Sequence, residues 1–547
     1  MAKLLLKRFV HFLLKPFREH FLFLISFFVL ATSSCALLQF FSLRRYFNAI
    51  LVLNHCFVLS YLVTLIIGLI QPKLIRKIVQ IVILVISALD FACNIYCIFE
   101  LGYLFDSDFA MLILNTDLHE SKEFATTLIP NWVIFTVLST YLIFLILWVL
   151  SHRHNLNLGK RLSKVALCLV CLCVIENVYS WPVWQEGPIK RISELPEYEA
   201  PRDLESYYTH PRLTFKEHNI IPNNIILIIG ESFTRCHSSL YGYEKETNPQ
   251  LKEYKNRFLL FTFDSVNSPA SMTTPSIKFM MSTYAKHNEG EKDKKWYEFT
   301  SIIELMQISG YNCCWYSNQG RGSKSNSPSR AFAESCDMYS FLQNEGAESS
   351  VIVTDKKFDM VLVDSSYVYA SHIIPEQHHF IIYHMMGSHF DYRKRYPKEF
   401  SKFTENDYPD HPQHHRNILA AYDNSILYND YVVSQIINLY KDKEAVIIYL
   451  PDHGQVMYRD PNMPDHYVHG KTEDKDSESF ALGVEIPMIV FTSSLFQERH
   501  PDTMERIKYR QDNPKSWNSD DLPYFIMDLI GVKEINGENI QSKSIIN

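Results

Sequence analysis

Several polar residues in the second half of this chain follow apolar runs, at the points where strands would end. Glu231 closes the run 224–232, and Asp452 and His453 close the run 445–454. Two carboxylates and one imidazole form a mixed oxygen and nitrogen ligand set that suits zinc. A hydroxyl in the fourth position would be deprotonated by the metal and would become a nucleophile. The alternative is a buried Asp–His pair that only stabilises a loop.

Further candidate residues stand at corresponding places in the chain. Thr273 follows the second apolar run, Asn318 follows the third as a candidate substrate contact, and His384 ends the fourth. His384, His389 and His469 could bind phosphoryl oxygens or donate a proton to a leaving group. Because ligands of parallel sheets bind beyond the carboxyl ends of the strands, we expect these side chains to converge there.

The apolar runs that must position these residues are continuous rather than alternating, which is typical of buried strands. Helical patterns at 297–309 and 415–440 separate some of them. We therefore predict an α/β domain with a mainly parallel sheet and helices on both faces. The runs are 224–232, 258–266, 311–317, 378–387, 445–454 and 487–494.

The first 181 residues are dominated by Leu, Ile, Phe and Val. Since about 20 apolar helical residues cross a bilayer, we predict an α-helical membrane domain with five spans. The first span is interpreted as an uncleaved anchor, because its apolar run is longer than that of a signal peptide. The spans are approximately 20–41, 47–70, 78–101, 128–150 and 163–181.

The distribution of Lys and Arg predicts the orientation of this domain. They gather before the first span, between the second and third, and between the fourth and fifth, which places these segments in the cytoplasm. Arg44 and Arg45 count against this rule. We therefore expect a membrane domain at 1–181, a proline-rich linker at 182–220 and a catalytic domain at 221–547 outside the cytoplasmic membrane.

The overall charge does not support nucleic-acid binding. The 547 residues include 53 Lys and Arg against 60 Asp and Glu, for a net charge of -7. Proteins that bind DNA or RNA concentrate basic residues on one face. No nucleic-acid partner is expected.

The cysteines of the polar half permit disulfides in an oxidising compartment. The sequence does not choose among their pairings. These cysteines are Cys236, Cys313, Cys314 and Cys336. The role of Asp90, inside the third predicted span, is also left open.

Five short motifs follow the apolar helices in a fixed order. They are Ile229-Gly230-Glu231-Ser232, SPASMTTPSIKFMMS at 268–282, His384-Met385-Met386-Gly387-Ser388-His389, Pro451-Asp452-His453-Gly454 and His469-Gly470. In order and spacing they resemble the bacterial phosphoethanolamine transferases that modify lipopolysaccharide. The resemblance covers nearly the whole chain. It implies an alkaline phosphatase or sulfatase-like domain in the periplasm, anchored in the inner membrane.

The resemblance also implies roles for individual residues. His384, His389 and His469 would contact the phosphoethanolamine group. Zinc would be bound tightly as one ion, and a second ion is left open because Gln455 stands where many relatives carry an acidic residue. The zinc ligands would be Glu231, Thr273, Asp452 and His453.

Two further contacts are suggested by the same resemblance. The segment 116–120 is similar to a family stretch near the donor lipid, which makes Glu120 a candidate for binding the ethanolamine ammonium. An ordinary interfacial helix is the alternative reading of this segment. The basic residue that contacts phosphate could be Arg321 or Lys324.

Together these observations predict transfer of phosphoethanolamine from phosphatidylethanolamine to lipopolysaccharide through an intermediate on Thr273, by a chain that acts as a monomer. A core heptose is favoured over lipid A, because Pro269 and Phe279 occupy places where lipid A modifying relatives carry cysteines. Phosphoglycerol transfer, or hydrolysis of a sulfate or phosphate ester, is the alternative on the same fold. A membrane protein that binds lipid without catalysis is a second alternative.

Helix capping predicts which threonine is the nucleophile. Pro275 is favoured at the first position of a helix, which would make Thr274 the N-cap. Thr273 would then be free to point outward at the positive end of the helix. The family's nucleophilic threonine aligns with the same residue.

Overall fold

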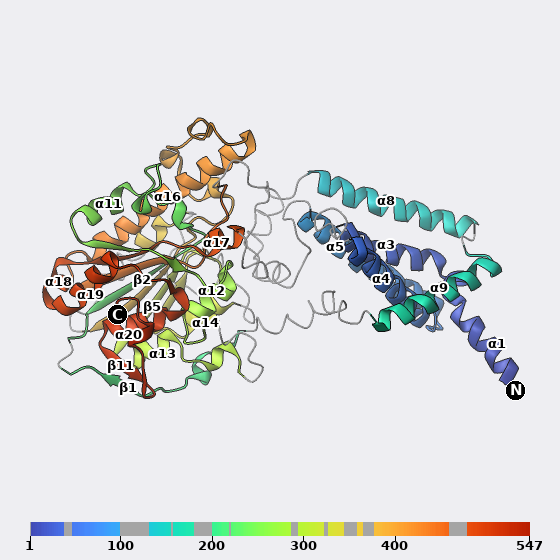
Figure 1. Cartoon of the computed structure of the whole chain (residues 1–547), viewed down its shortest axis with the longest axis horizontal. Helices are drawn as coiled ribbons and strands as arrows, with labels where there is room; N and C mark the ends of the chain where they lie inside the picture. Colours follow the sequence, from blue (N-terminus) through green and yellow to red (C-terminus); the bar gives the residue numbers. More distant parts are fainter. Residues whose placement is uncertain are drawn as a thin grey trace. The chain divides into compact units, whose positions relative to one another are not determined.

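A computed structural model of the chain shows two compact units, Met1–Pro196 and Glu197–Asn547 (Figure 1). The described residues are 2–37, 46–98, 131–154, 157–179, 200–217, 220–285, 294–321, 327–343, 358–364, 377–458 and 478–547.

The described part of the first unit is helical. Side chains from α2, α3, α4 and α9 pack into a small core of Phe17, Leu24, Tyr61 and Val170. Tyr61 also donates a hydrogen bond from its hydroxyl to the carbonyl of Leu13 at 2.8 Å. The helices are α1 (Ala2–Leu13), α2 (Lys15–Glu19), α3 (Phe21–Leu37), α4 (Tyr46–Ile67), α5 (Lys73–Tyr96), α8 (Asn131–His154) and α9 (Lys160–Tyr179).

Helices lie at all five predicted spans, but only some of them are long and apolar enough to cross a bilayer. Among the described residues, Ile50–Ile67 and Lys73–Tyr96 meet that condition. The apolar helical stretches Phe21–Thr32 and Asn131–Ile143 are shorter. Large apolar side chains are exposed on these helices, as in Phe135 at 73%. The number of spans therefore stays a prediction.

The second unit is built on a seven-stranded sheet of order β3-β9-β8-β2-β7-β5-β6. Each predicted apolar run contains one of its strands, and β6 is an additional strand that the sequence analysis missed. The strands are β2 (Asn224–Gly230), β3 (Leu260–Phe263), β5 (Tyr311–Ser317), β6 (Met338–Phe341), β7 (His378–His384), β8 (Ala445–Pro451) and β9 (Met488–Thr492).

This sheet is mixed, which corrects the prediction of a mainly parallel sheet. β8, β2, β7, β5 and β6 pair in parallel, whereas β9 is antiparallel to both β8 and β3. Every residue of β9 is buried. A continuous apolar run indicates that both faces of a strand are buried, but it does not indicate whether the strand runs parallel or antiparallel to its neighbours.

Helices cover both faces of the sheet, and Figure 1 shows α11 and α16 on one side with α13, α14 and α20 on the other. Side chains of β2 alternate between the two cores: Ile225, Leu227 and Ile229 pack in one, and Ile226 and Ile228 in the other. The helices are α11 (Pro249–Asn256), α12 (Thr273–Met280), α13 (Ile302–Ile308), α14 (Pro328–Glu334), α16 (Gln413–Tyr440), α17 (Glu478–Val484), α18 (Ser494–Arg499), α19 (Pro501–Asp512) and α20 (Leu522–Leu529).

Two small sheets complete this unit. One has the order β1-β11-β12, and the other pairs β4 with β10. β1 lies inside the predicted linker 182–220, yet it pairs antiparallel with β11 near the end of the chain. The last part of that segment therefore belongs to the fold of the second unit. The strands are β1 (Leu213–Phe215), β4 (Val266–Asn267), β10 (Trp517–Asn518), β11 (Val532–Ile535) and β12 (Glu538–Asn539).

Candidate active site

The polar ends of three neighbouring strands meet at one edge of the large sheet. β2 lies between β7 and β8, and the register places the last residues of the three strands at one level. Glu231 follows directly after β2, Asp452 and His453 follow β8, and His384 ends β7. The structure thus brings together side chains that are far apart in the sequence.

Glu231, Asp452 and His453 form a buried group of metal-ligating side chains. Their ligand atoms all lie within 4.8 Å of one another. His453 Nε2 lies 3.3 Å from Glu231 Oε1 and 3.5 Å from Asp452 Oδ2. Within the described part of the chain, Asp452 Oδ2 receives no hydrogen bond. A buried carboxylate oxygen without a donor, close to a second carboxylate, fits a bound cation.

Neighbouring groups orient these ligands. The Nδ1 atom of His453 lies 2.6 Å from the carbonyl oxygen of Gly454, so a neutral ring that donates there presents Nε2 to the group. Ser232 Oγ donates to Glu231 Oε1 at 2.6 Å, and Gln319 Nε2 donates to Oε2 at 3.0 Å. Such outer contacts hold metal ligands in place before the metal binds.

Thr273 adds a hydroxyl to this group. Its Oγ1 atom lies 3.2 Å from Glu231 Oε2 and 3.3 Å from His453 Nε2. Thr273 is the first residue of α12. The hydroxyl therefore stands at the positive end of a helix, where an anionic oxygen and a phosphoryl group are both favoured.

The start of α12 differs from the capping prediction. The N-cap is Met272, whose backbone is extended and whose side chain makes no cap hydrogen bond. Thr274 is therefore the second residue of the helix rather than its cap, and Pro275 is the third rather than the first. Proline is tolerated there because the N–H groups of the first turn have no intrahelical partner. Pro275 marks the first turn without fixing its first residue.

Burial and charge shift the pKa values of the three ligands. Burial acts to raise the pKa of Glu231, but the hydrogen bond and charge of His453 outweigh it and hold that pKa well below its usual range. Burial, followed by the charge of Glu231, raises the pKa of Asp452 to about 8. Burial acts to lower the pKa of His453, but Asp452 and Glu231 raise it to about 9. Without a metal, Asp452 and His453 therefore retain protons at neutral pH.

These raised pKa values predict that zinc binding at pH 7 releases protons. Asp452 and His453 must both lose a proton before they can bind a metal, so we expect roughly one to two protons per zinc ion. Zinc affinity should consequently fall as the pH falls from 8 to 6. Calorimetric titration in two buffers of different ionisation enthalpy measures the number of protons. Equal heats in both buffers would contradict the prediction.

His384 is buried and neutral. Burial lowers its pKa to about 4, against the charge of Glu231. Its Nδ1 atom lies 3.2 Å from Ser317 Oγ, whereas Nε2 has no hydrogen-bond partner among the described residues. A neutral ring with an unpartnered nitrogen suits a contact with a phosphoryl oxygen. His389 is half-buried, and its charge helps to lower the pKa of Glu231.

Asn318, predicted as a substrate contact, supports a loop of the site, and its role toward a substrate stays a prediction. Its Nδ2 atom donates to Asp359 Oδ1 at 2.8 Å, and its Oδ1 atom accepts from Gln343 Nε2 at 2.9 Å. Asp359 in turn accepts from the backbone N–H groups of Met386 and Gly387, each at 2.8 Å. Both polar groups of Asn318 are therefore used inside the protein.

The loop from His384 to His389 packs closely against Glu231. Gly387 has a φ of +50°, and a Cβ atom there would lie 2.8 Å from the backbone nitrogen of Glu231. Ser388 N donates to the carbonyl oxygen of Glu231 at 3.0 Å. Only glycine gives this loop both the left-handed backbone and the close approach.

Two residues of the site escaped the sequence analysis. Gln319, one position after Asn318, contacts Glu231, and its Nε2 atom also donates to the carbonyl of Met385 at 2.9 Å. The end of an apolar run does not resolve such a shift of one residue. Asp359 follows no apolar run, so no spacing in the sequence indicated it.

The remaining residues singled out by the sequence lie elsewhere. Glu120, His469 and Lys324 fall outside the described residues. Arg321 donates to Glu334 Oε1 from Nε and Nη2 at 3.1 and 2.6 Å, so its guanidinium is already engaged. No disulfide joins the described cysteines of the second unit, which are Cys236, Cys313, Cys314 and Cys336.

Known families match both parts of the chain. Residues 223–532, more than half of the chain, match the Sulfatase family. Residues 59–181 match the family described as Phosphoethanolamine transferase EptA/EptB. The chain belongs to the phosphoethanolamine transferase family and carries a sulfatase-like domain. This family member is a phosphotransferase enzyme.

One related sequence and two related solved structures show how similar this phosphoethanolamine transferase family member is to known proteins. Phosphoethanolamine transferase EptC of Escherichia coli strain RS218 is 25% identical over 493 residues, which cover 84% of this chain and 81% of that protein. The C-terminal periplasmic domain of EptC from Escherichia coli, in a complex with Zn, is 26% identical with a TM-score of 0.50, covering 62% of this chain and 90% of that chain. The integral membrane protein EptA, a lipooligosaccharide phosphoethanolamine transferase from Neisseria meningitidis, is 16% identical with a TM-score of 0.66. The match covers 96% of this chain and 98% of that chain and shows that the two share a fold.

Proposed function

We propose that the enzyme transfers phosphoethanolamine from phosphatidylethanolamine to lipopolysaccharide. The observation that carries this proposal is the Thr273 hydroxyl at the start of α12, 3.2 Å from Glu231 and 3.3 Å from His453. The names of the relatives support phosphoethanolamine as the transferred group. The order of the sequence motifs supports lipopolysaccharide as the acceptor.

Zinc is the proposed cofactor, held by Glu231, Asp452 and His453 with the Thr273 hydroxyl. The donor set, the unpartnered Oδ2 of Asp452 and the zinc complex of the related EptC domain support it. When bound, zinc would lower the pKa of the hydroxyl and offset negative charge on the phosphoryl oxygens. One tightly bound ion per chain is proposed, because Gln455 stands where an acidic ligand for a second ion would be expected.

The proposed reaction has two displacements at phosphorus. In the first, Thr273 Oγ1 forms a bond to phosphorus while the bond from phosphorus to the diacylglycerol oxygen breaks. The net proton moves from the Thr273 hydroxyl to the diacylglycerol oxygen. In the second, an oxygen of an acceptor hydroxyl forms a bond to the same phosphorus while the bond from phosphorus to Thr273 Oγ1 breaks. The net proton moves from the acceptor hydroxyl to Thr273 Oγ1, which restores the Thr273 hydroxyl.

The histidines are proposed to act on the phosphoryl group and the leaving oxygen. His384, neutral and with Nε2 unpartnered among the described residues, donates a hydrogen bond to a phosphoryl oxygen. His469 supplies the proton of the leaving oxygen. His389 binds the phosphoethanolamine group, and Glu120 binds its ammonium.

The acceptor is tested by mass spectrometry of lipopolysaccharide from cells with and without the gene. The added phosphoethanolamine mass should appear on the core oligosaccharide, with heptose as the favoured position, only when the gene is present. Fragmentation separates the core from lipid A. Addition to lipid A alone would overturn the heptose assignment while leaving the transferase activity in place.

A phosphoglycerol transferase or an ester hydrolase on the same fold is the second candidate. Purified enzyme given phosphatidylethanolamine and phosphatidylglycerol, each labelled in its headgroup, distinguishes the two. Transfer of labelled phosphoethanolamine with the glycerol donor inert supports our proposal. Release of the free headgroup without an adduct would favour hydrolysis.

We propose the predicted topology for the whole enzyme: a five-span domain at 1–181, a linker at 182–220 and a catalytic domain at 221–547 in the periplasm, in a chain anchored in the inner membrane. The Lys and Arg asymmetry supports it. A fluorescent protein that folds only in the cytoplasm should be dark when fused to the C-terminus. The same protein fused ahead of Met1 should be bright. A bright C-terminal fusion would invert the topology.

A further inference from the structure

A hollow of about 630 Å³ lies between α16 and the segment 393–405. Its floor is a strip of α16 that includes Asn417, Ala420, Ala421 and Asn424. These residues share one face because they are three or four positions apart. We call this space the α16 hollow. Its volume is in the range of sites for small ligands.

The rim of the α16 hollow carries two exposed cations. Arg393 and Lys398 are both exposed. Neither forms an ion pair within the part of the chain that the structure describes. Glu405 also lines the hollow, but its Oε2 atom accepts a hydrogen bond from Gln413 at 2.8 Å. Glu405 keeps its negative charge, but two cations against one carboxylate leave the wall net positive, which suits an anionic ligand.

The rest of the wall suits a sugar ring. Tyr396 and Phe403 are half-buried aromatic residues that line the hollow, and aromatic rings supply apolar surface on which a sugar ring can pack. Asn424 holds Phe403 in place. Its Oδ1 atom accepts a hydrogen bond from the Phe403 N–H, and its Nδ2 atom donates one to the Phe403 carbonyl oxygen, each at 2.8 Å. Asn417 makes no side-chain hydrogen bond to the described residues, so its amide can serve a ligand.

Hydrogen bonds connect the α16 hollow to the metal-ligating group. Ser425, next to Asn424, donates from Oγ to Ser388 Oγ at 2.9 Å. Ser388 donates from its backbone nitrogen to Glu231 at 3.0 Å. Because β8 begins just after α16 ends, the first turns of α16 lie at the carboxyl edge of the strands, where the metal-ligating group also stands. A ligand in the hollow is thus near the same carboxyl edge of the sheet as Thr273, although α16 and α12 pack on opposite faces.

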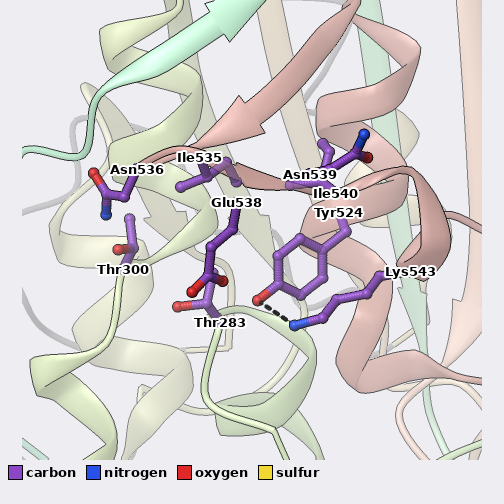
Figure 2. A pocket seen from close by; sticks show the side chains of 9 residues that line it. All are labelled: Thr283, Thr300, Tyr524, Ile535, Asn536, Glu538, Asn539, Ile540 and Lys543. Atoms are coloured by element: carbon purple, nitrogen blue, oxygen red, sulfur yellow. Dashed lines mark hydrogen bonds between the residues drawn. The ribbon is translucent and has the colours of Figure 1, made fainter.

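A second pocket, of about 160 Å³, lacks this character. Figure 2 shows the Lys543 amine directed at the Tyr524 hydroxyl, to which it donates a hydrogen bond at 3.2 Å. The same amine lies 4.3 Å from the centre of the Tyr524 ring. Glu538 also lines this pocket. Its cation is engaged and a carboxylate stands nearby, so an anion is disfavoured there.

We propose that the α16 hollow binds an anionic saccharide of the acceptor, with Arg393 and Lys398 contacting its phosphate or carboxylate groups. The sugar ring packs on Tyr396 and Phe403, and Asn417 binds its hydroxyls. This site deepens the proposed function and rests on it, because the anionic saccharide is the core of lipopolysaccharide. It assigns the acceptor to a surface separate from the groups that bind the transferred phosphoethanolamine.

The test compares full-length wild-type enzyme in detergent with the double variant Arg393→Gln/Lys398→Gln. The KM for deacylated lipopolysaccharide core should rise roughly five- to tenfold, and the increase should shrink in high salt. Formation of the phosphoethanolamine adduct from the donor should not change. Glu405→Gln, which removes a carboxylate from the same wall, should lower the KM. Lys441→Gln, at the other end of α16, removes one positive charge from an exposed site outside the hollow and should have no effect.

Binding of the core oligosaccharide without donor separates the two proposals. Calorimetry should show binding to the wild type, weaker binding to the double variant, and weaker binding of dephosphorylated core if phosphate is the anion recognised. Equal affinity of the wild type and the double variant would overturn the acceptor site, even if transfer proceeds. If the core oligosaccharide binds in a way that depends on Arg393 and Lys398, but the enzyme forms no adduct, the acceptor site stands and the proposed transfer is overturned.

Discussion

Thr273→Ala should abolish the phosphoethanolamine adduct and reduce transfer by roughly 10⁴-fold or more, as loss of a covalent nucleophile does in other enzymes. The Thr273 hydroxyl lies within 3.3 Å of both Glu231 Oε2 and His453 Nε2, at the positive end of α12. Alanine keeps the helix but removes the oxygen that bonds to phosphorus. Mass spectrometry of the intact protein after incubation with phosphatidylethanolamine measures the adduct.

Thr274→Ala is the matched control for this prediction. Thr274 is the next residue of the same helix and is half-buried, so its loss tests whether any change at the start of α12 disturbs the reaction. We expect the adduct to persist in Thr274→Ala. Thr273→Ser, which keeps a hydroxyl, should retain part of the transfer. An adduct mapped by peptide sequencing to Thr274 would contradict the assignment, as would normal transfer by Thr273→Ala.

Six of the seven strands of the large sheet could be predicted from the sequence because each lies in a short and largely apolar run. β2 and β8 show this plainly, since every residue in both is buried. The direction of β9 could not be predicted, because burial on both faces is the same in a parallel and an antiparallel central strand. β6 was missed because its first two residues are exposed and it lacks a continuous apolar run.

The metal-ligating group could be predicted for a related reason. Parallel strands in register end at one level, so Glu231 after β2 and the pair Asp452 and His453 after β8 had to be neighbours. The contacts that orient this group depend instead on side-chain direction and on loops. Gln319 reaches Glu231 although Asn318 is nearer to its strand, and Asp359 reaches the site from a segment without any periodic pattern.

The start of α12 illustrates the limit of local rules. The capping argument placed Thr273 toward the site, and the structure does so, but through a helix that begins two residues earlier than expected. Proline is compatible with any position in the first turn, so Pro275 alone could not fix the boundary. Ile277 and Phe279 of α12 pack in the same core as the side chains of β2, and this packing rather than a cap holds the helix that carries the Thr273 hydroxyl.

Asp452→Asn should remove zinc from the enzyme, with an affinity loss of more than about 100-fold. Asp452 Oδ2 lies 3.5 Å from His453 Nε2 and receives no hydrogen bond from the described residues, so a metal is the partner that its position suits. The amide has nearly the same shape but carries no negative charge. Elemental analysis of the purified variant measures bound zinc, and transfer activity should fall with it.

The thermal stability of the variant gives a second, independent reading of the same site. Burial and Glu231 raise the pKa of Asp452, so in the metal-free protein this carboxyl is held largely protonated at pH 7 and the neutral amide should leave Tm nearly unchanged. Zinc should raise the Tm of the wild type and not that of Asp452→Asn, because only the wild type binds it in the folded state. Asp423→Asn is the control: Asp423 is a buried partner of His237 at 2.7 Å, and its loss should lower Tm while zinc still binds. Full zinc content in Asp452→Asn, or zinc loss in Asp423→Asn with its fold intact, would place the metal elsewhere.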